Sequence, residues 1–198
     1  MTRLHGSPTP EHELTGELLR VISTLLAENP TLVRVLFVVA MAASTVLGAL
    51  LHRSDRSGLL AFLAIVGLLG ALALTLWPSG GRAGIFCTVQ FSIPFQGIDT
   101  LANLALMLPL TLFTALRLGR PLPVFVAVSG FSALVELFQA LVPALGRACD
   151  TNDWFMNTIG AALGGFIAIA IIAGEARRLE QHPRTIEKPG GHPADRRP

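Results

Sequence analysis

Charged side chains are scarce in this 198-residue chain, and their scarcity excludes whole classes of protein. Only 14% of the residues are charged, whereas 52% are hydrophobic, a balance too apolar for an ordinary soluble domain. All but one of the fifteen basic residues are arginine, and the formal net charge is only +2. No basic stripe with interleaved aromatic residues occurs, so we expect no nucleic-acid partner. The composition therefore indicates an integral membrane protein.

The beginning of the chain lacks the basic start and apolar core of a cleaved secretory signal. Residues 1–30 form a polar segment that contains four glutamates. We expect residues 1–13 to be disordered, because they bury too little apolar surface to offset the entropy of ordering. The spacing of leucine and isoleucine from Leu14 to Ala27 predicts an amphipathic helix on a membrane surface. The first hydrophobic helix is then expected to stay in the membrane as an anchor.

Long apolar windows fill residues 31–173. A membrane-spanning helix needs about 20 mostly apolar residues, and five windows meet this requirement, each closed by proline, glycine or charge. The expected spans are approximately Leu32 to Leu51, Leu59 to Trp77, Thr100 to Leu118, Leu122 to Val142 and Trp154 to Ala173. The sequence therefore predicts an all-α integral membrane helical bundle with five transmembrane helices. The alternative is four spans with an interfacial first segment. Residues 174–198 carry mixed charge, proline and glycine, which predicts a disordered cytoplasmic tail.

Arginines in the short loops predict the orientation of the bundle, because basic residues resist translocation across the membrane. With five spans, alternate loops share a side. The larger basic set is Arg53, Arg56, Arg117, Arg120, Arg177, Arg178, Arg184 and Lys188, and it opposes Arg20, Arg34, Arg82 and Arg147. We therefore expect a multi-pass protein of the cell membrane with its C-terminus in the cytoplasm and its N-terminus outside.

Polar side chains recur at helical spacing near the outer ends of the last three predicted spans. Ionisable residues inside a membrane are costly, so each needs a partner or a function. Three- and four-residue spacings place these side chains on one stripe of each helix. The predicted polar cluster comprises Asp99, Asn103, Ser132, Glu136, Gln139, Arg147, Asp150, Asp153 and Asn157. Arg147 is the expected counter-charge for Glu136, Asp150 or Asp153. The alternative is that the polar residues serve only as hydrogen bonds between helices.

Small residues follow the polar stripe of the last span. Gly160 and Gly164 are four residues apart, so they lie on the same face of a helix. A Gly-x-x-x-Gly pair removes side-chain bulk and lets a second backbone approach closely. We therefore expect the backbone of a neighbouring helix to pack there and to press the polar stripes together.

These spacings resemble the VanZ-like membrane family. The resemblance rests on three runs: Asp99-x-x-x-Asn103 with Pro109, Ser132-x-x-x-Glu136-x-x-Gln139, and Arg147-x-x-Asp150-x-x-Asp153-x-x-x-Asn157 with Gly160 and Gly164. It covers roughly residues 59–173 and leaves the first predicted span outside a four-helix core. Met107 and Thr111 stand where the family commonly has an aromatic residue and glycine. The family is named after an accessory protein that gives low-level teicoplanin resistance. The resemblance implies the fold, the membrane location and the polar motif.

Three classes of function fit the cluster. The first is a cell-envelope binding or accessory protein that recognises a lipid head group, a lipid-linked precursor or a glycopeptide. The second is an enzyme in which Glu136 is the general base and Asp150 or Asp153 orients the substrate. We rank it lower because no nucleophile–base pair is evident, and all five histidines lie in the tails or the first loop, where no metal or other cofactor site is expected. The third is proton-coupled transport, which would require an oligomer because no repeat is visible.

Two cysteines, Cys87 and Cys149, fall in loops assigned to the outer side. A disulfide persists in an oxidising compartment and would join the two loops beside the cluster. Two cysteines also occur easily by chance, and the sequence says nothing about loop geometry. We therefore expect them to be unpaired.

Overall fold

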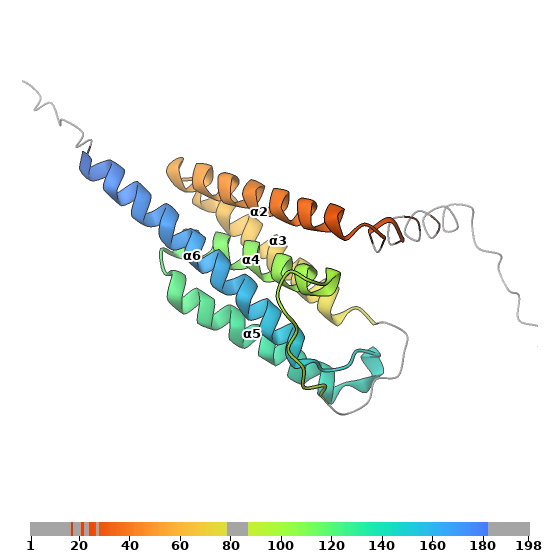
Figure 1. Cartoon of the computed structure of the whole chain (residues 1–198). Coiled ribbons are helices and arrows are strands. Elements are labelled where there is room, and N and C mark those ends of the chain that lie inside the picture. The colour runs from red at the N-terminus through yellow and green to blue at the C-terminus, as the bar shows by residue number, and fades with distance from the viewer. Residues whose placement is uncertain (1–16, 18–20, 22–23, 27, 79–86, 182–198) are drawn as a thin grey trace, which may run out of the picture.

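Five long helices make up most of the described part of the chain (Figure 1). The computed structural model describes residues 17, 21, 24–26, 28–78 and 87–181, and within these residues the chain contains no β-strand. The helices are α2 (Pro30–Arg53), α3 (Ser57–Leu76), α4 (Ile98–Leu118), α5 (Pro121–Leu141) and α6 (Thr151–Gln181), with a short 3-10 helix η1 (Pro143–Leu145) before α6. All five α-helices are long and apolar enough to cross a membrane. The predicted helical membrane bundle is confirmed.

Local chemistry accounts for several helix boundaries. Pro30 and Pro121 occupy the first turns of α2 and α5. Backbone N–H groups in a first turn have no intrahelical acceptor, so proline, which lacks the N–H, costs no hydrogen bond there. Gly119 ends α4 with a left-handed φ of 64°, a conformation that glycine adopts without steric cost. The turns that join α2 to α3 and α4 to α5 are therefore tight, and consecutive helices run in opposite directions.

Helix α4 lies at the centre of the bundle and contacts each of the other four long helices. It contains most of the fully buried core side chains, among them Leu104, Met107 and Leu112. The helix continues through Pro109. Helices α2 and α3 have few buried residues and expose valine, leucine and phenylalanine side chains outward, as helices that face lipid do. The polar features of the molecule are thus arranged around α4.

The closest contact in the bundle joins α6 to α4. A Cβ atom added to Gly160 would lie 2.5 Å from the carbonyl oxygen of Leu104, and one added to Gly164 would lie 2.5 Å from that of Leu108. Side-chain atoms cannot occupy this space, so only glycine permits the approach. The prediction that a second backbone packs on the Gly-x-x-x-Gly pair is confirmed.

The C-terminal end of α6 corrects the predicted domain boundary. The helix continues through Gln181, although the sequence predicts that the last span ends near Ala173 and that disorder follows. The residues from Glu175 to Gln181 are mostly good helix formers, and Glu175 forms an ion pair with Arg53 of α2 at 3.3 Å. Residues 182–198 and most of the expected amphipathic helix from Leu14 to Ala27 lie outside the described residues.

The two ends of the bundle differ in their side chains. We call one the arginine end, where α2, α4 and α6 finish and α3 and α5 begin. Its described basic residues are Arg53, Arg56, Arg117, Arg120, Arg177 and Arg178. The opposite end carries η1 and residues 87–97, which we call the strap; they form no helix, turn at residues 94–97 and lead into α4. The predicted polar cluster lies at this second end.

Candidate functional site

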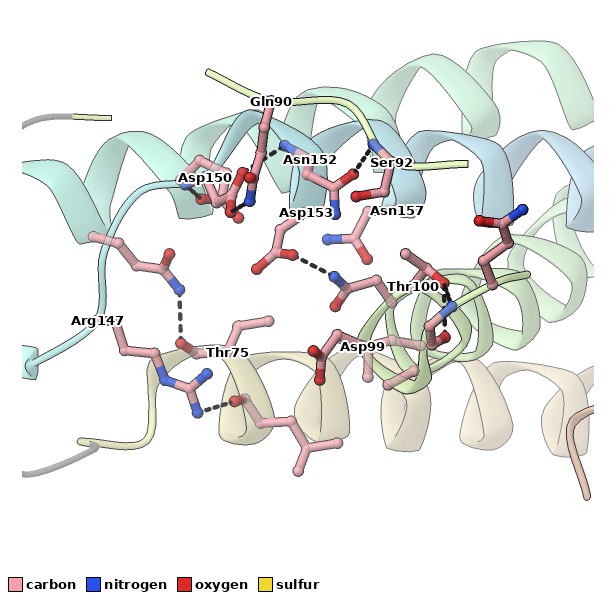
Figure 2. A pocket seen from close by; sticks show the side chains of 18 of the residues that line it. Thr75, Gln90, Ser92, Asp99, Thr100, Arg147, Asp150, Asn152, Asp153 and Asn157 are labelled. Carbon is pink, nitrogen blue, oxygen red and sulfur yellow. Dashed lines mark hydrogen bonds between the residues drawn. The ribbon is translucent and has the colours of Figure 1, made fainter. Parts of the chain in front are cut away.

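A polar cavity of about 780 Å³ opens at the end of the bundle opposite the arginine end. The C-terminal turn of α3, the strap, the start of α4, the end of α5 and the start of α6 enclose it (Figure 2). Eight of the nine residues in the predicted cluster line this cavity: Asp99, Asn103, Glu136, Gln139, Arg147, Asp150, Asp153 and Asn157. The ninth, Ser132, is 1% exposed and accepts a hydrogen bond from Asn157 behind the cavity wall. The three helical stripes therefore converge.

Glu136 fastens the start of α6 to α5. Its side chain is 7% exposed, and its Oε2 accepts a hydrogen bond from the backbone N–H of Asp150 at 2.9 Å. Asp150 directly precedes α6, and its own Oδ1 accepts from the N–H of Asn152 at 2.8 Å. A carboxylate that accepts from the first turn in this way caps a helix and interacts favourably with its dipole. The two acids thus fix where α6 enters the bundle.

Two amide side chains link the helices across the cavity wall. Asn103 of α4 donates from Nδ2 to Oδ1 of Asp153 on α6 at 2.6 Å. Asn157, one turn further along α6, donates from Nδ2 to the hydroxyl oxygen of Ser132 on α5 at 2.9 Å. Asn157 is 2% exposed, and its Oδ1 is buried without a hydrogen-bond partner. Most buried polar atoms in proteins are paired, so this acceptor stands out.

Arg147 corrects the predicted ion pair. Its Nε donates to the carbonyl of Trp77 at 3.2 Å, and its Nη2 donates to the carbonyl of Leu74 at 2.9 Å. Within the described part of the chain it has no carboxylate oxygen within 4.0 Å. The last carbonyls of a helix lack intrahelical donors and carry partial negative charge, so they compete with the acids for a guanidinium. Gln139 donates to the neighbouring carbonyl of Thr75 at 2.9 Å, which adds a second link from α5 to α3.

The two cysteines correct a further expectation, because Cys87 and Cys149 form a disulfide. Their Cα atoms lie 4.5 Å apart, within the range that a bridge requires. Backbone pairing brings them together, since the N–H of Thr88 donates to the carbonyl of Cys149 and the N–H of Thr151 donates to that of Thr88. The bridge therefore joins the start of the strap to the start of α6, beside the cavity.

The strap supplies polar residues that the prediction of the cluster omits. Gln90 donates from Nε2 to Oδ2 of Asp150 at 2.6 Å, and the backbone N–H of Ser92 donates to Oδ1 of Asn152 at 2.8 Å. Gln90, Ser92 and Gln96 line the cavity, whereas Val89 before Gln90 and Phe91 after it are 76% and 63% exposed. This alternation of polar and apolar residues has the period of an extended chain. It is the sequence signal that identifies these residues.

The arrangement suits the binding of a polar molecule. Carboxylate, amide and hydroxyl groups face a volume that lies within the range of small-molecule sites. Among the described residues, no three histidine, cysteine, aspartate or glutamate side chains converge in a way that could hold a metal ion. The carboxylates that could serve in proton transfer, Glu136 and Asp153, each accept one hydrogen bond from the protein. The geometry thus provides hydrogen-bond and charge recognition.

Comparison with known proteins supports the family resemblance. The family model described as VanZ/LLP1 matches residues 27–173. The match therefore includes α2, which lies upstream of the resemblance over residues 59–173. No curated protein and no solved structure matches the chain. The matched region contains α2 to α5, α6 as far as Ala173 and every residue of the polar cluster. On this evidence the chain is a multi-pass membrane protein that belongs to the VanZ/LLP1 family.

Proposed function

We propose that this protein is a cell-envelope binding or accessory protein. Its cavity receives the polar head group of an envelope lipid, of a lipid-linked precursor or of a lipophilic glycopeptide. The observation that carries the proposal is the cavity of about 780 Å³ in which side chains of α4, α5, α6 and the strap converge. Sites of this size hold small molecules or head groups of similar volume. Recognition, rather than a reaction, accounts for the abundance of hydrogen-bonding groups.

The position of the cavity supports a lipid-borne ligand. It lies at the ends of helices that are long enough to span a membrane, which is the depth of lipid head groups. Its wall also includes the apolar side chains of Leu74, Leu106 and Ile93. These residues can contact the first carbon atoms of an acyl or prenyl chain while the head group occupies the polar part. A lipid ligand then satisfies both parts of the wall.

Two features support an outward-facing cavity. Short-loop arginines mark the cytoplasmic side of membrane proteins, and Arg53, Arg56, Arg117 and Arg120 lie at the end opposite the cavity, against Arg34 and Arg147 at the cavity end. The disulfide beside the cavity persists only where the compartment is oxidising. Both features favour a cavity in the outer leaflet of the cell membrane.

Lipid binding by the wild type and by Glu136→Gln tests the proposal. The glutamine retains an acceptor for the N–H of Asp150 but removes the charge, so the fold is kept. The purified proteins would be reconstituted in nanodiscs and titrated with short-chain phospholipids and with a lipid-linked sugar. We expect binding by the wild type and a loss of about tenfold or more in the variant. Glu180→Gln, an exposed position at the other end of α6, is the matched control.

The same pair of proteins separates the alternatives. Glu136-dependent hydrolysis of the lipid-linked sugar would replace the proposal by an enzyme, and Glu136-dependent proton flux into liposomes would replace it by a transporter. Absence of binding to every probe would refute a head-group site.

Labelling in intact cells tests the orientation. Replacing Cys149 by serine frees Cys87, which is exposed in the structure. We expect a membrane-impermeant maleimide to label Cys149→Ser without prior reduction. The wild type should be labelled only after an impermeant reductant opens the bridge. Labelling of Cys149→Ser only after the cells are permeabilised would reverse the orientation.

A further inference from the structure

Negative groups outnumber positive ones in the cavity. Asp99, Glu136, Asp150 and Asp153 line it, and Arg147 is the basic residue among its described lining residues. Two nitrogens of the Arg147 guanidinium donate to the carbonyls of Leu74 and Trp77, so the cation is directed toward the end of α3. Carboxylates in a partly desolvated hollow produce a negative potential that attracts cations. The cavity therefore favours a positively charged group.

Hydrogen-bond donors and acceptors are used unequally in the cavity. The amide nitrogens of Gln90 and Asn103 donate to carboxylates of the protein, each at 2.6 Å, and that of Gln139 donates to a backbone carbonyl. Acceptors remain. Oδ2 of Asp153 and both carboxylate oxygens of Asp99 form no hydrogen bond within the described part of the chain, and Asp99 is exposed at the start of α4. A bound molecule would therefore have to supply donors.

Asn157 provides an independent indication of a ligand. Its Nδ2 donates to Ser132, whereas its Oδ1 is buried without a hydrogen-bond partner on a side chain that is 2% exposed and lines the cavity. Asp153 and Asn157 are four residues apart, so they lie on the same face of α6. Figure 2 shows Asp99, Asp153 and Asn157 around the same hollow. The unpaired acceptor thus lies deeper than the two carboxylates that face it from α4 and α6.

We propose that the cavity selects a head group that carries a protonated primary amine. The ammonium lies between the carboxylates of Asp99 and Asp153, and one of its N–H groups donates to Oδ1 of Asn157. This inference rests on the proposed function, because it names the chemical class that the head-group site accepts. A primary ammonium offers three N–H donors together with its charge. It therefore matches both the negative potential and the unused acceptors.

The number of N–H donors, and not the charge alone, sets the expected selectivity. A trimethylated ammonium carries the same charge but has no N–H, so it would leave the buried acceptor of Asn157 unpaired. A site built to hydrogen-bond a ligand rejects an analogue that lacks the donor. A glycerol head group has hydroxyl donors but no cation, so it would leave the carboxylates uncompensated. Three phospholipids with identical acyl chains therefore separate the contribution of the charge from that of the N–H donors.

Calorimetric titration of the purified protein in detergent tests the inference. The probes are dioctanoyl phosphatidylethanolamine, dioctanoyl phosphatidylcholine and dioctanoyl phosphatidylglycerol, with soluble ethanolamine as the free-amine arm. We expect phosphatidylethanolamine to bind at least about tenfold more tightly than the other two lipids. Ethanolamine should bind more weakly than the lipid because it lacks the acyl chains that contact the apolar wall.

Asp99→Asn is the variant of choice because Asp99 is exposed and has no hydrogen bond within the described part of the chain to lose. We expect it to weaken phosphatidylethanolamine binding about tenfold, because the ammonium loses one of its two carboxylates. Asp55→Asn, an exposed acid at the arginine end, should change nothing.

The outcomes distinguish this inference from the function on which it rests. Equal affinity for the three lipids, with no effect of Asp99→Asn, would overturn the amine selectivity and leave head-group binding intact. Equal affinity for ethanolamine and phosphatidylethanolamine would support recognition of a primary amine but would overturn the proposal that the amine belongs to a lipid. No binding to any probe would overturn both proposals.

Discussion

The arginine end and the cavity end hold their charges in different ways. At the arginine end the charges are mostly exposed, and the one ion pair among the described residues, Arg53 with Glu175, joins a half-exposed arginine to a less exposed acid. At the cavity end Glu136, Asp150 and Asp153 are at least partly buried, and each accepts hydrogen bonds from named neighbours. Exposed charges are cheap to change, whereas buried hydrogen-bonded ones are costly. The first end is suited to define orientation and the second to define a binding geometry.

If the cavity end is held by more interactions than the arginine end, its disulfide should make the largest single contribution to the stability of the folded protein. The bridge joins residues separated by 62 positions, so it restricts a long stretch of the unfolded chain. We expect replacement of both cysteines by serine to lower the free energy of unfolding by about 2–4 kcal/mol. Denaturant titration in detergent, with and without reductant, measures the effect. Reductant should lower the free energy of unfolding of the wild type and leave that of the double variant unchanged. A wild-type protein that is equally stable with and without reductant would contradict the prediction.

Two glycines of α6 compare the two ends within one helix. Gly160 contacts the backbone of Leu104 near the cavity, whereas Gly174 has no neighbouring atom within 4 Å of an added Cβ. Alanine at position 160 should therefore lower the free energy of unfolding by about 1–3 kcal/mol, because α4 and α6 must separate. Alanine at position 174 should be neutral or stabilise by up to about 1 kcal/mol. The same denaturant titration measures both changes in the free energy of unfolding. Equal changes for the two variants would show that α6 is packed no more closely at the cavity end than at the arginine end.

Arg147 tests whether the cavity end depends on hydrogen bonds to helix carbonyls. Arg147→Ala should cost about 1–2 kcal/mol, because the carbonyls of Leu74 and Trp77 lose a charged donor. Lysine at this position should recover only part of the loss, since an ammonium cannot reproduce the fork of a guanidinium. Hydrogen exchange should report the change locally, as faster exchange in the last turn of α3. Unchanged exchange there would show that the hydrogen bonds from Arg147 to the end of α3 do not stabilise that turn.

The smallest effect is expected at the arginine end. Arg53→Ala removes an ion pair in which the arginine side chain is 53% exposed, so the loss should stay below about 1 kcal/mol. High salt should reduce it further, because screening weakens exposed pairs. Thermal unfolding at low and high ionic strength measures it. A loss as large as that of Arg147→Ala would show that the two ends do not differ in the proposed way.

The helical part of the molecule follows from its sequence because helical spacing is a local property. Apolar windows, prolines and glycines locate the five helices, and the positions of Asp99, Glu136 and Asp153 along them already place these residues at one end. The Gly160 and Gly164 pair similarly predicts the contact with a second backbone. In each case, a period of 3.6 residues determines which side chains share a face.

The connections follow from the sequence only in part because their geometry depends on distant residues. The pairing of Cys87 with Cys149 depends on backbone hydrogen bonds around Thr88, which no spacing announces. The sequence predicts a contact between Arg147 and an acid, but Arg147 donates to the carbonyls of Leu74 and Trp77 at the end of α3. The strap does carry a readable signal in the alternation of Gln90 and Ser92 with apolar neighbours, and that signal has a period of two rather than that of a helix.

The disulfide also constrains how the protein is made. It closes a covalent ring that contains the strap, α4, α5 and η1. Cys149 follows α5 in the chain, so it reaches Cys87 only after the hairpin of α4 and α5 has crossed the membrane and returned. The bridge therefore forms only after α5 has been made and Cys149 has come to lie on the same side of the membrane as Cys87. Until then the chain carries two free thiols, which distinguish an incomplete molecule from a finished one.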